Sequence, residues 1–453
     1  MARLNSLRSF WNSRLLPLFN PAVFFLTLFV ALVKLFEWDL IEPAINADIH
    51  RLLILFDLSP VKVRVDISGF SIAAARFVLV ACFLILLVDN RKVRRLKFWL
   101  ASLPFLGIML VSGVSRYWSV SIPISETRYL YFAAVAMGGI YIGLECNPSK
   151  IIQLFEVFSI LVVVGNFYAV YRQPGFAIMT GRGVDGAWRG LFWWKSYSGE
   201  MAAFSASLFL FQLAGFKHHR WYVNLYHLIF YALSIFLLVK AKSATELLAL
   251  LAAHGIFVLA AFYLQWGHRL SRVHWVGIGT MGLMIALGAW IGRSFLLEVI
   301  GRNAALTGRL PLWKALIPFI QNRFLWGYGF GEAFWKNSRY TQVVWKEVRW
   351  NAPFAHNGFI EILLGTGIIG LVLWMAFLLQ DACLSVKYFL REHALAAGVF
   401  SAWIAYIVVS NLADNMLGSY EYFTWFLLAI TFALLIRDRL DQQRPVPADK
   451  SKA

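Results

Sequence analysis

Long apolar runs, many close to twenty residues in length, constrain this chain more than any other feature of its sequence. About 20 apolar residues cross a bilayer as one helix, and 60% of the 453 residues are hydrophobic. The runs are continuous and do not alternate every second residue, which excludes an outer-membrane barrel. Only 15% of the residues are charged, against about a quarter in soluble domains. The sequence therefore predicts an all-α polytopic membrane protein.

Charged residues and prolines divide the apolar runs into twelve expected transmembrane helices. They lie at 21–37, 69–88, 98–115, 129–144, 151–171, 198–216, 221–239, 244–264, 275–293, 358–380, 396–412 and 420–436. We expect residues 1–453 to form a single integral-membrane domain that ends in a polar cytoplasmic tail, residues 438–453. The segment 294–357 is too long for a simple connector, so we expect this loop to carry function.

Short basic loops set the expected orientation of the chain. Positive charges crowd residues 91–97 and 217–220, and both loops fall on the side of the two termini. By the positive-inside rule this side is cytoplasmic. The outer side then carries three cation-rich loops, 172–197, 240–243 and 294–357, which departs from the rule. Binding of an anion on the outer face is the first explanation for this departure and for part of the net charge of +18.

The long outer loop contains a predicted amphipathic helix on the membrane surface. Thr307 is a suitable N-cap, and the first turn tolerates Pro311. Apolar side chains recur at helical spacing, namely Leu310, Trp313, Ile317 and Ile320. Arg309 stands four residues before Trp313, at the edge of this face, where a guanidinium reaches headgroup or diphosphate depth. A snorkelling interfacial arginine is the alternative interpretation.

His356 stands at the start of the tenth expected helix, within the segment PFAHNGFIE of residues 353–361. An imidazole changes its protonation near neutral pH and is a suitable proton acceptor for a hydroxyl nucleophile. Asn357 and Glu361 are four residues apart on one helix face, so either could orient the imidazole or the acceptor. The small residues of the segment 365–370 allow close packing of this helix. Taken alone, a histidine at this position would ordinarily be a cap or an interfacial residue, and it is the neighbouring residues that favour the functional role.

Cations and aromatic residues alternate in the loop 172–197, where Trp188, Arg189 and Lys195 lie close in sequence. Arginine matches phosphate oxygens in a bidentate geometry and lysine adds a point charge. An exposed tryptophan stacks on sugar rings or anchors the chain at the interface. Lys242 adds a cation at the mouth of another expected helix, where snorkelling is the alternative role.

In this order, the segments resemble the bacterial O-antigen ligase and polymerase superfamily, most closely the exopolysaccharide polymerases of the succinoglycan type. The resemblance runs from about residue 110 to about residue 430, and its specificity lies in the ordered set. The matching segments are SRYWS (115–119) with Arg128, GAWRGLFWWK (186–195), KSAT (242–245), LTGRLPLW (306–313), WGYGFG (326–331), and HNG (356–358) with Glu361 and Gly370. Ser196 departs from the family, which often has asparagine there, so a role for an amide at this position is in doubt.

The resemblance implies a glycosyltransferase of exopolysaccharide biosynthesis in the bacterial inner membrane, with its active site facing the periplasm and both termini in the cytoplasm. Members transfer a glycan from undecaprenyl diphosphate to another lipid-linked glycan as polymerases, or to lipid A-core as ligases. The family needs no metal or other cofactor. The implied partners are the lipid-linked oligosaccharide, the acceptor glycan, membrane lipids and a chain-length regulator, and nucleic acid is not among them. Polymerase and ligase both stay open, and the motifs favour the polymerase.

On this basis we assign roles to the candidate residues. The diphosphate is expected to bind Arg189, Lys195, Lys242 and Arg309. It is already a good leaving group, and cations alone are enough to neutralise its negative charge. His356 is expected to activate the acceptor hydroxyl, as a base or as an orienting partner, for direct displacement with inversion. The supporting or acceptor-binding residues are Trp188, Asn357 and Glu361.

Two rival functions start from other residues. Glu37, Trp38 and Asp39 resemble the acidic motif of multi-helix glycosyltransferases that use a divalent metal. Arg76 and Lys34 lie inside apolar runs and are expected to face the bundle interior, where they would line the pathway of a transporter for polysaccharide or lipid carrier. Transporters usually show related halves and helices broken at midplane, and the sequence indicates neither.

Overall fold

The computed structural model describes residues 16–32, 67–89, 96–181, 184–215, 220–269, 308–417 and 422–442. Several predictions lie outside these described residues. They concern the ninth expected helix at 275–293, the motif of residues 37–39, Lys34, Thr307, and most of the two basic loops.

The described part of the chain is almost entirely helical. In chain order the elements are α2 (Leu16–Leu32), α4 (Ile67–Asp89), α5 (Leu96–Ala101), α6 (Leu103–Val114), η2 (Ser115–Tyr117), α7 (Ile122–Glu145), α8 (Pro148–Arg172), α9 (Pro174–Ala177), β1 (Ile178–Met179), β2 (Ala187–Trp188), α10 (Lys195–Gly215), α11 (Trp221–Ala241), α12 (Ala244–Trp266), η3 (Gly267–Arg269), α15 (Arg309–Asn322), α16 (Ser338–Val348), α17 (Gly358–Glu392), η5 (Leu395–Gly398), α18 (Val399–Asn411) and α19 (Tyr422–Gln442). The two short strands form an antiparallel pair with Ile178 opposite Trp188.

Within the described residues a helix lies at each of the expected positions, which confirms the all-α prediction there. Among the described residues, four helices are long and apolar enough to cross a membrane: α8, α11, α12 and α17. Shorter apolar segments add to these in α2, α4, α6 and α18. The apolar helices indicate an integral membrane protein, while the count of twelve spans stays a prediction.

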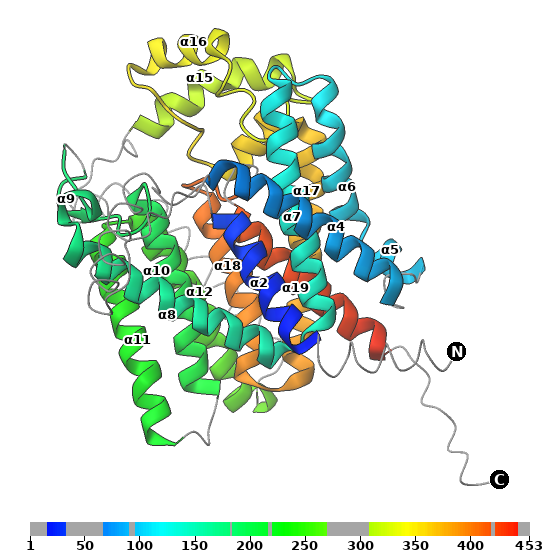
Figure 1. The fold of residues 1–453 in the computed structure, drawn as a ribbon, viewed down its shortest axis with the longest axis vertical. Helices are drawn as coiled ribbons and strands as arrows, with labels where there is room; N and C mark the ends of the chain where they lie inside the picture. Colours follow the sequence, from blue (N-terminus) through cyan, green and yellow to red (C-terminus); the bar gives the residue numbers. More distant parts are fainter. Residues whose placement is uncertain are drawn as a thin grey trace, which may run out of the picture.

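The helices form a bundle in which the last three helices lie between two groups. Figure 1 shows α8 to α12 on one side, α4 to α7 on the other, and α17, α18 and α19 between them. The contacts agree, because α19 packs on α7 whereas α18 packs on α12. Aromatic rings fill the centre, where Trp425 stacks on Phe132 at 4.5 Å and on Phe105 at 5.1 Å between ring centroids.

Two expectations about the first half of the chain are wrong. The helix expected at 98–115 is broken at Ser102 into α5 and α6, and Pro104 in the first turn of α6 accounts for the break, since proline cannot donate to the preceding turn. Arg76 is exposed and does not face the interior. The buried face of α4 is formed instead by small residues such as Ala74, Ala75 and Cys82.

The outer-loop segment carries two helices at one end of the bundle. Figure 1 shows α15 and α16 at the end opposite to the one where α19 finishes. They pack on each other over a small separate core with Leu312, Leu316 and Val344 at its centre. The predicted helix is thus confirmed as α15, with Gly308 as its N-cap. Leu310 and Ile317 of the predicted apolar face are 39% and 49% exposed, whereas a second face, which the sequence did not predict, packs on the protein.

Helix α17 is broken at Gly367, whose backbone has φ 68° and ψ −166°. The turn-rich segment 324–330 lies along the break and replaces the lost helical hydrogen bonds. Tyr328 N donates to Leu364 O at 2.7 Å, Gly329 N to Gly365 O at 2.9 Å, and Ile368 N to Phe324 O at 2.8 Å. The expectation of no broken helix is therefore wrong, although the backbone groups at this break are paired, as a low-dielectric environment requires.

The glycines of the WGYGFG segment make this pairing possible, and we call residues 324–330 the clamp segment. Gly327 has φ 67°, and a Cβ there would lie 2.6 Å from the backbone of Gly365. Gly329 has φ 110°, and a Cβ there would lie 2.3 Å from the Ser119 hydroxyl. Only glycine combines such left-handed backbone with such close approach. The clamp segment thereby ties α17 to the start of α7.

Candidate functional site

Four helices begin in one region, and each begins at or directly after a candidate residue. Lys195 is the first residue of α10, Lys242 lies two residues before α12, Arg309 is the first residue of α15, and His356 lies two residues before α17. Side-chain contacts join these helix starts in pairs, as described below. A helix N-terminus carries a partial positive charge and free amide donors, so this region combines fixed cations with four favourable dipoles.

The start of α15 is fixed against the segment that carries His356. The Trp313 indole Nε1, one turn after Arg309, donates to Ala355 O at 2.8 Å. Gly308 lies so close to Trp350 that an added Cβ would stand 3.3 Å from the indole Nε1. The Trp350 ring in turn lies 5.8 Å from the His356 ring. Arg309 and His356 are therefore brought to the same end of the outer-loop helices, as the sequence interpretation requires.

His356 adopts a left-handed backbone conformation with φ 52°, which is unusual for a residue with a Cβ and marks a position that the surroundings enforce. Its ring packs 4.3 Å from the Phe354 ring. Burial, together with the positive charge of Arg309, lowers the pKa of His356 to about 3. The imidazole is therefore neutral at physiological pH and can accept a hydrogen bond.

Asn357 and Glu361 have other partners than the imidazole. The Asn357 side chain caps α17 by accepting from the amides of Phe359 and Ile360, both at 3.0 Å. The Glu361 carboxylate is buried and accepts from Trp335 Nε1 at 2.8 Å and from Ala355 N at 3.0 Å. Both residues thus hold the backbone on either side of His356, and their expected action on its ring stays a prediction.

The two lysines are linked through backbone carbonyls. Lys195 Nζ donates to Lys242 O at 3.0 Å, and Lys242 Nζ donates to Asp185 O at 2.8 Å. Lys242 itself has a left-handed backbone with φ 50°. An added Cβ at Gly199 would stand 2.9 Å from the Ser243 Cβ, so α10 and α12 begin in close contact. These links bring the loops 172–197 and 240–243 together.

The sequence interpretation missed two buried acids, Glu246 in α12 and Asp414 after α18. Glu246 is fully buried in the first turn of α12 and accepts from the Ser410 hydroxyl at 3.0 Å. Asp414 follows α18, and its Oδ1 accepts from Asn415 N at 3.0 Å. A carboxylate inside an apolar run was the available signal for Glu246, and a polar cluster between the last two expected helices was the signal for Asp414.

Arg189 and Trp188 are seated in the folded loop before α10. Arg189 Nε donates to Phe176 O at 2.6 Å and Nη1 donates to Trp193 O at 3.2 Å. The guanidinium also lies 4.1 Å from the centroid of the Phe176 ring. The Trp188 ring packs edge-on against Phe167 and Phe236. These contacts give both residues a part in shaping the loop, and their ligand-binding roles stay predictions.

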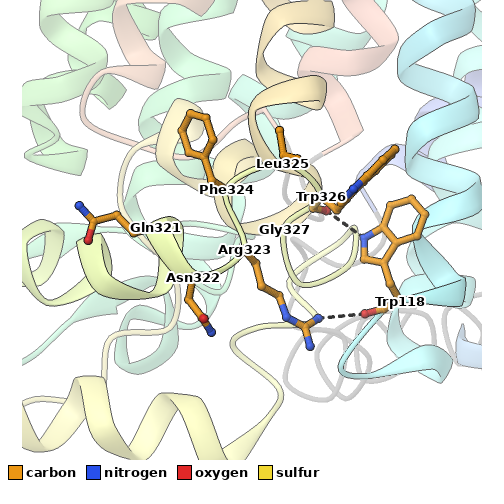
Figure 2. Close-up of a pocket in the computed structure, with 8 residues that line it drawn as sticks. All are labelled: Trp118, Gln321, Asn322, Arg323, Phe324, Leu325, Trp326 and Gly327. Carbon is orange, nitrogen blue, oxygen red and sulfur yellow. Dashed lines mark hydrogen bonds between the residues drawn. The ribbon is translucent and has the colours of Figure 1, made fainter.

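A separate open groove of about 750 Å³ lies at the other end of α15. Figure 2 shows Trp118 beside Trp326, with the Trp118 Nε1 donating to Trp326 O at 2.9 Å and Arg323 Nη1 donating to Trp118 O at 3.1 Å. The first and last residues of α15 are about 20 Å apart at 1.5 Å per residue. The groove is therefore distinct from the region around His356.

One family model matches part of the chain. Residues 229–375 match a family model described as O-antigen ligase, which confirms the superfamily that the ordered motifs indicated. The match includes Lys242, Arg309 and His356, whereas Arg189, Lys195 and Asp414 lie outside it. It supports glycan transfer of the ligase or polymerase type by a membrane protein. No curated protein matches the chain.

Proposed function

We propose that this protein is a polysaccharide polymerase that transfers a glycan from undecaprenyl diphosphate to a hydroxyl of an acceptor lipid-linked glycan at the periplasmic face of the inner membrane. Two observations support the proposal: Lys195 donates to the backbone of Lys242, and the start of α15, which carries Arg309, is fixed against the segment that carries His356. A diphosphate is the anion that such a site suits, because helix N-termini and fixed cations both bind phosphate oxygens.

The helix starts retain donors for such an anion. The side chain of Ser243, the N-cap of α12, makes no cap hydrogen bond within the described structure, and Gly308, the N-cap of α15, has no side-chain oxygen. The first amides of both helices are therefore candidates for phosphate oxygens. Arg309 supplies a bidentate fork, and Lys195 and Lys242 supply point charges.

The reaction that fits this site is a single displacement. The acceptor hydroxyl oxygen forms a bond to the anomeric carbon while the bond from that carbon to the diphosphate oxygen breaks, which inverts the configuration. The neutral His356 imidazole accepts the hydroxyl hydrogen bond, and the hydroxyl proton passes to the imidazole or to the departing diphosphate. Because Arg309 helps to lower the pKa of His356, a diphosphate bound to Arg309 would offset that charge and raise this pKa, so the imidazole becomes more basic once the donor is bound.

The second candidate function is that of a ligase that transfers the glycan to lipid A-core. The description of the matching family as O-antigen ligase favours it. Both functions need the same diphosphate site and the same activated hydroxyl, and they differ only in the acceptor.

The proposal is tested with purified protein in liposomes that contain a lipid-diphosphate-linked repeat unit, with and without lipid A-core. We expect a ladder of products without lipid A-core, and loss of the ladder in His356→Ala. The matched control is His393→Ala, because His393 also has a left-handed backbone, φ 47°, but lies at the opposite end of α17. This control should retain the ladder.

The other outcomes separate the alternatives. Product that forms only with lipid A-core identifies the ligase. A folded His356→Ala protein as active as wild type refutes the role of His356. No product from folded protein with the authentic donor refutes glycan transfer and favours the transporter.

A further inference from the structure

We propose that Trp313 and Glu361 are positioning residues, which hold the Ala355 backbone at its two polar atoms and thereby fix the imidazole of His356. This inference rests on the proposed function, because it takes His356 as the residue that activates the acceptor hydroxyl. Trp313 lies one turn after Arg309 on α15, so a single helix would serve both the diphosphate and the histidine.

The backbone of Ala355, directly before His356, is held from two different helices. Its amide N donates to Oε2 of Glu361 on α17 at 3.0 Å, and its carbonyl O accepts from the indole Nε1 of Trp313 on α15 at 2.8 Å. Ala355 is 0% exposed, so bulk water does not compete for either bond. The carbonyl belongs to the peptide group that joins Ala355 to His356, so Trp313 fixes the peptide plane that leads into His356.

The chain after His356 is fixed as well. The carbonyl O of Asn357 accepts from Glu361 N at 3.0 Å, and the Asn357 side-chain amide donates to Leu412 O at 3.1 Å. His356 therefore lies between two anchored peptide groups, and they hold its φ at 52°. A residue with a Cβ favours a negative φ when it is free to choose, and such a φ would point the imidazole in another direction.

The Glu361 carboxylate is itself held by a third side chain. The indole Nε1 of Trp335 donates to both carboxylate oxygens, to Oε1 at 2.8 Å and to Oε2 at 3.0 Å. Glu361 and Trp335 are 3% and 5% exposed. Hydrogen bonds in such a buried place are stronger than in water, so the oxygen that accepts from Ala355 N keeps its position.

A group that takes part in a displacement has to be held accurately. A misplacement of about 1 Å can lower the rate about a hundredfold. The ring of Phe354, 4.3 Å from the His356 ring, limits rotation of the imidazole, while Trp313 and Glu361 restrain the backbone that carries it. The bond from Trp313 also keeps the histidine at a constant distance from the start of α15, where Arg309 is proposed to bind the diphosphate.

The experiment compares Trp313→Phe with a matched control, Trp345→Phe. Both substitutions keep an aromatic ring and remove an indole N–H that donates to a backbone carbonyl at 2.8 Å, that of Ala355 for Trp313 and that of Ala352 for Trp345. Both tryptophans pack on the same small core of the outer-loop helices. Only the carbonyl of Ala355 lies directly before His356, so only the loss of its bond should affect the reaction.

The readouts are the kcat of glycan transfer in liposomes and the Kd of undecaprenyl diphosphate, both for the full-length protein. We expect Trp313→Phe to lower kcat roughly tenfold and to leave Kd unchanged, because the cations proposed to bind the diphosphate are retained. Trp345→Phe should keep the kcat of wild type, although the unfolding temperatures of the two variants should fall by similar amounts. A merely structural role of Trp313 would give both variants the same kcat.

Trp335→Phe provides a second variant if Trp313→Phe does not fold, because it removes the donor to both Glu361 oxygens and should lower kcat in the same direction more weakly. An unchanged kcat in Trp313→Phe, an equal loss in Trp345→Phe, or a loss that a weaker Kd explains overturns the inference while leaving the proposed function intact. Absence of product from folded wild-type protein with the authentic donor overturns the proposed function, and the inference with it.

Discussion

Replacement of Gly327 by alanine tests whether the clamp segment holds the broken helix α17. The new Cβ would lie 2.6 Å from the carbonyl carbon and oxygen of Gly365 and 2.7 Å from Leu364 O. These are backbone atoms, so they cannot move aside as the end of a flexible side chain can. The left-handed φ of 67° adds about 1–2 kcal/mol for a residue with a Cβ, and overpacking adds about 1–3 kcal/mol. We therefore expect a loss of about 2–5 kcal/mol in the free energy of unfolding.

The measurement is thermal unfolding of the protein in detergent, followed by size-exclusion chromatography after heating. Because membrane proteins often unfold irreversibly, variants are compared at one heating rate. The matched control is Gly255→Ala on α12, where an added Cβ meets nothing within 4 Å and alanine gains about 1 kcal/mol over glycine in a helix. The unfolding temperature of Gly327→Ala should be at least several degrees below that of wild type. The unfolding temperature of Gly255→Ala should not be lower. An unfolding temperature for Gly327→Ala equal to that of wild type would refute the close approach and the role of the clamp segment.

Two further changes test the segment that carries His356. Asn357→Ala removes the cap of α17 and should lower the free energy of unfolding by about 1 kcal/mol. Asn357→Asp keeps an oxygen that accepts from the helix amides, so it should lower this free energy by less. Equal losses for the two variants in denaturation experiments would argue against capping. His356 should remain neutral in the folded protein down to about pH 3, so between pH 6.5 and 5 only the unfolded chain takes up its proton. Wild type should therefore lose up to about 2 kcal/mol relative to His356→Gln over that interval, and parallel pH dependences of the two unfolding temperatures would show that this histidine titrates normally.

Helix positions were predictable because an apolar run of about twenty residues has few alternatives to a helix. Deviations arose where a distant part of the chain decides the local structure. The break at Gly367 depends on pairing with the clamp segment about forty residues earlier, and no local pattern around residues 365–370 reveals a partner. The split at Ser102, in contrast, had a local signal in Pro104, which the hydropathy of the run outweighed.

The candidate site was predictable where its residues stand at the ends of apolar runs. His356, Lys195 and Lys242 lie at such ends because helix starts are where polar side chains meet the interface. Their partners were harder to predict. Glu361 lies in the first turn of α17, and helical spacing suggested that it or Asn357 orients the imidazole or the acceptor; its carboxylate binds Trp335 and Ala355 in the structure. Sequence spacing gives the face of a side chain, but not which neighbour fills that face.

The proposed function gives the cation-rich loops 172–197, 240–243 and 294–357 a common physical explanation. In the orientation that the sequence predicts, each of these loops departs from the positive-inside rule. In the structure, Lys195 from the first loop donates to the backbone of Lys242 in the second, and the start of α15, with Arg309 from the third, is fixed against the segment that carries His356. The proposed donor site draws on all three loops. Charges that serve a single binding site are selected for their position in space, so their distribution along the sequence need not follow the rule that orients the helices.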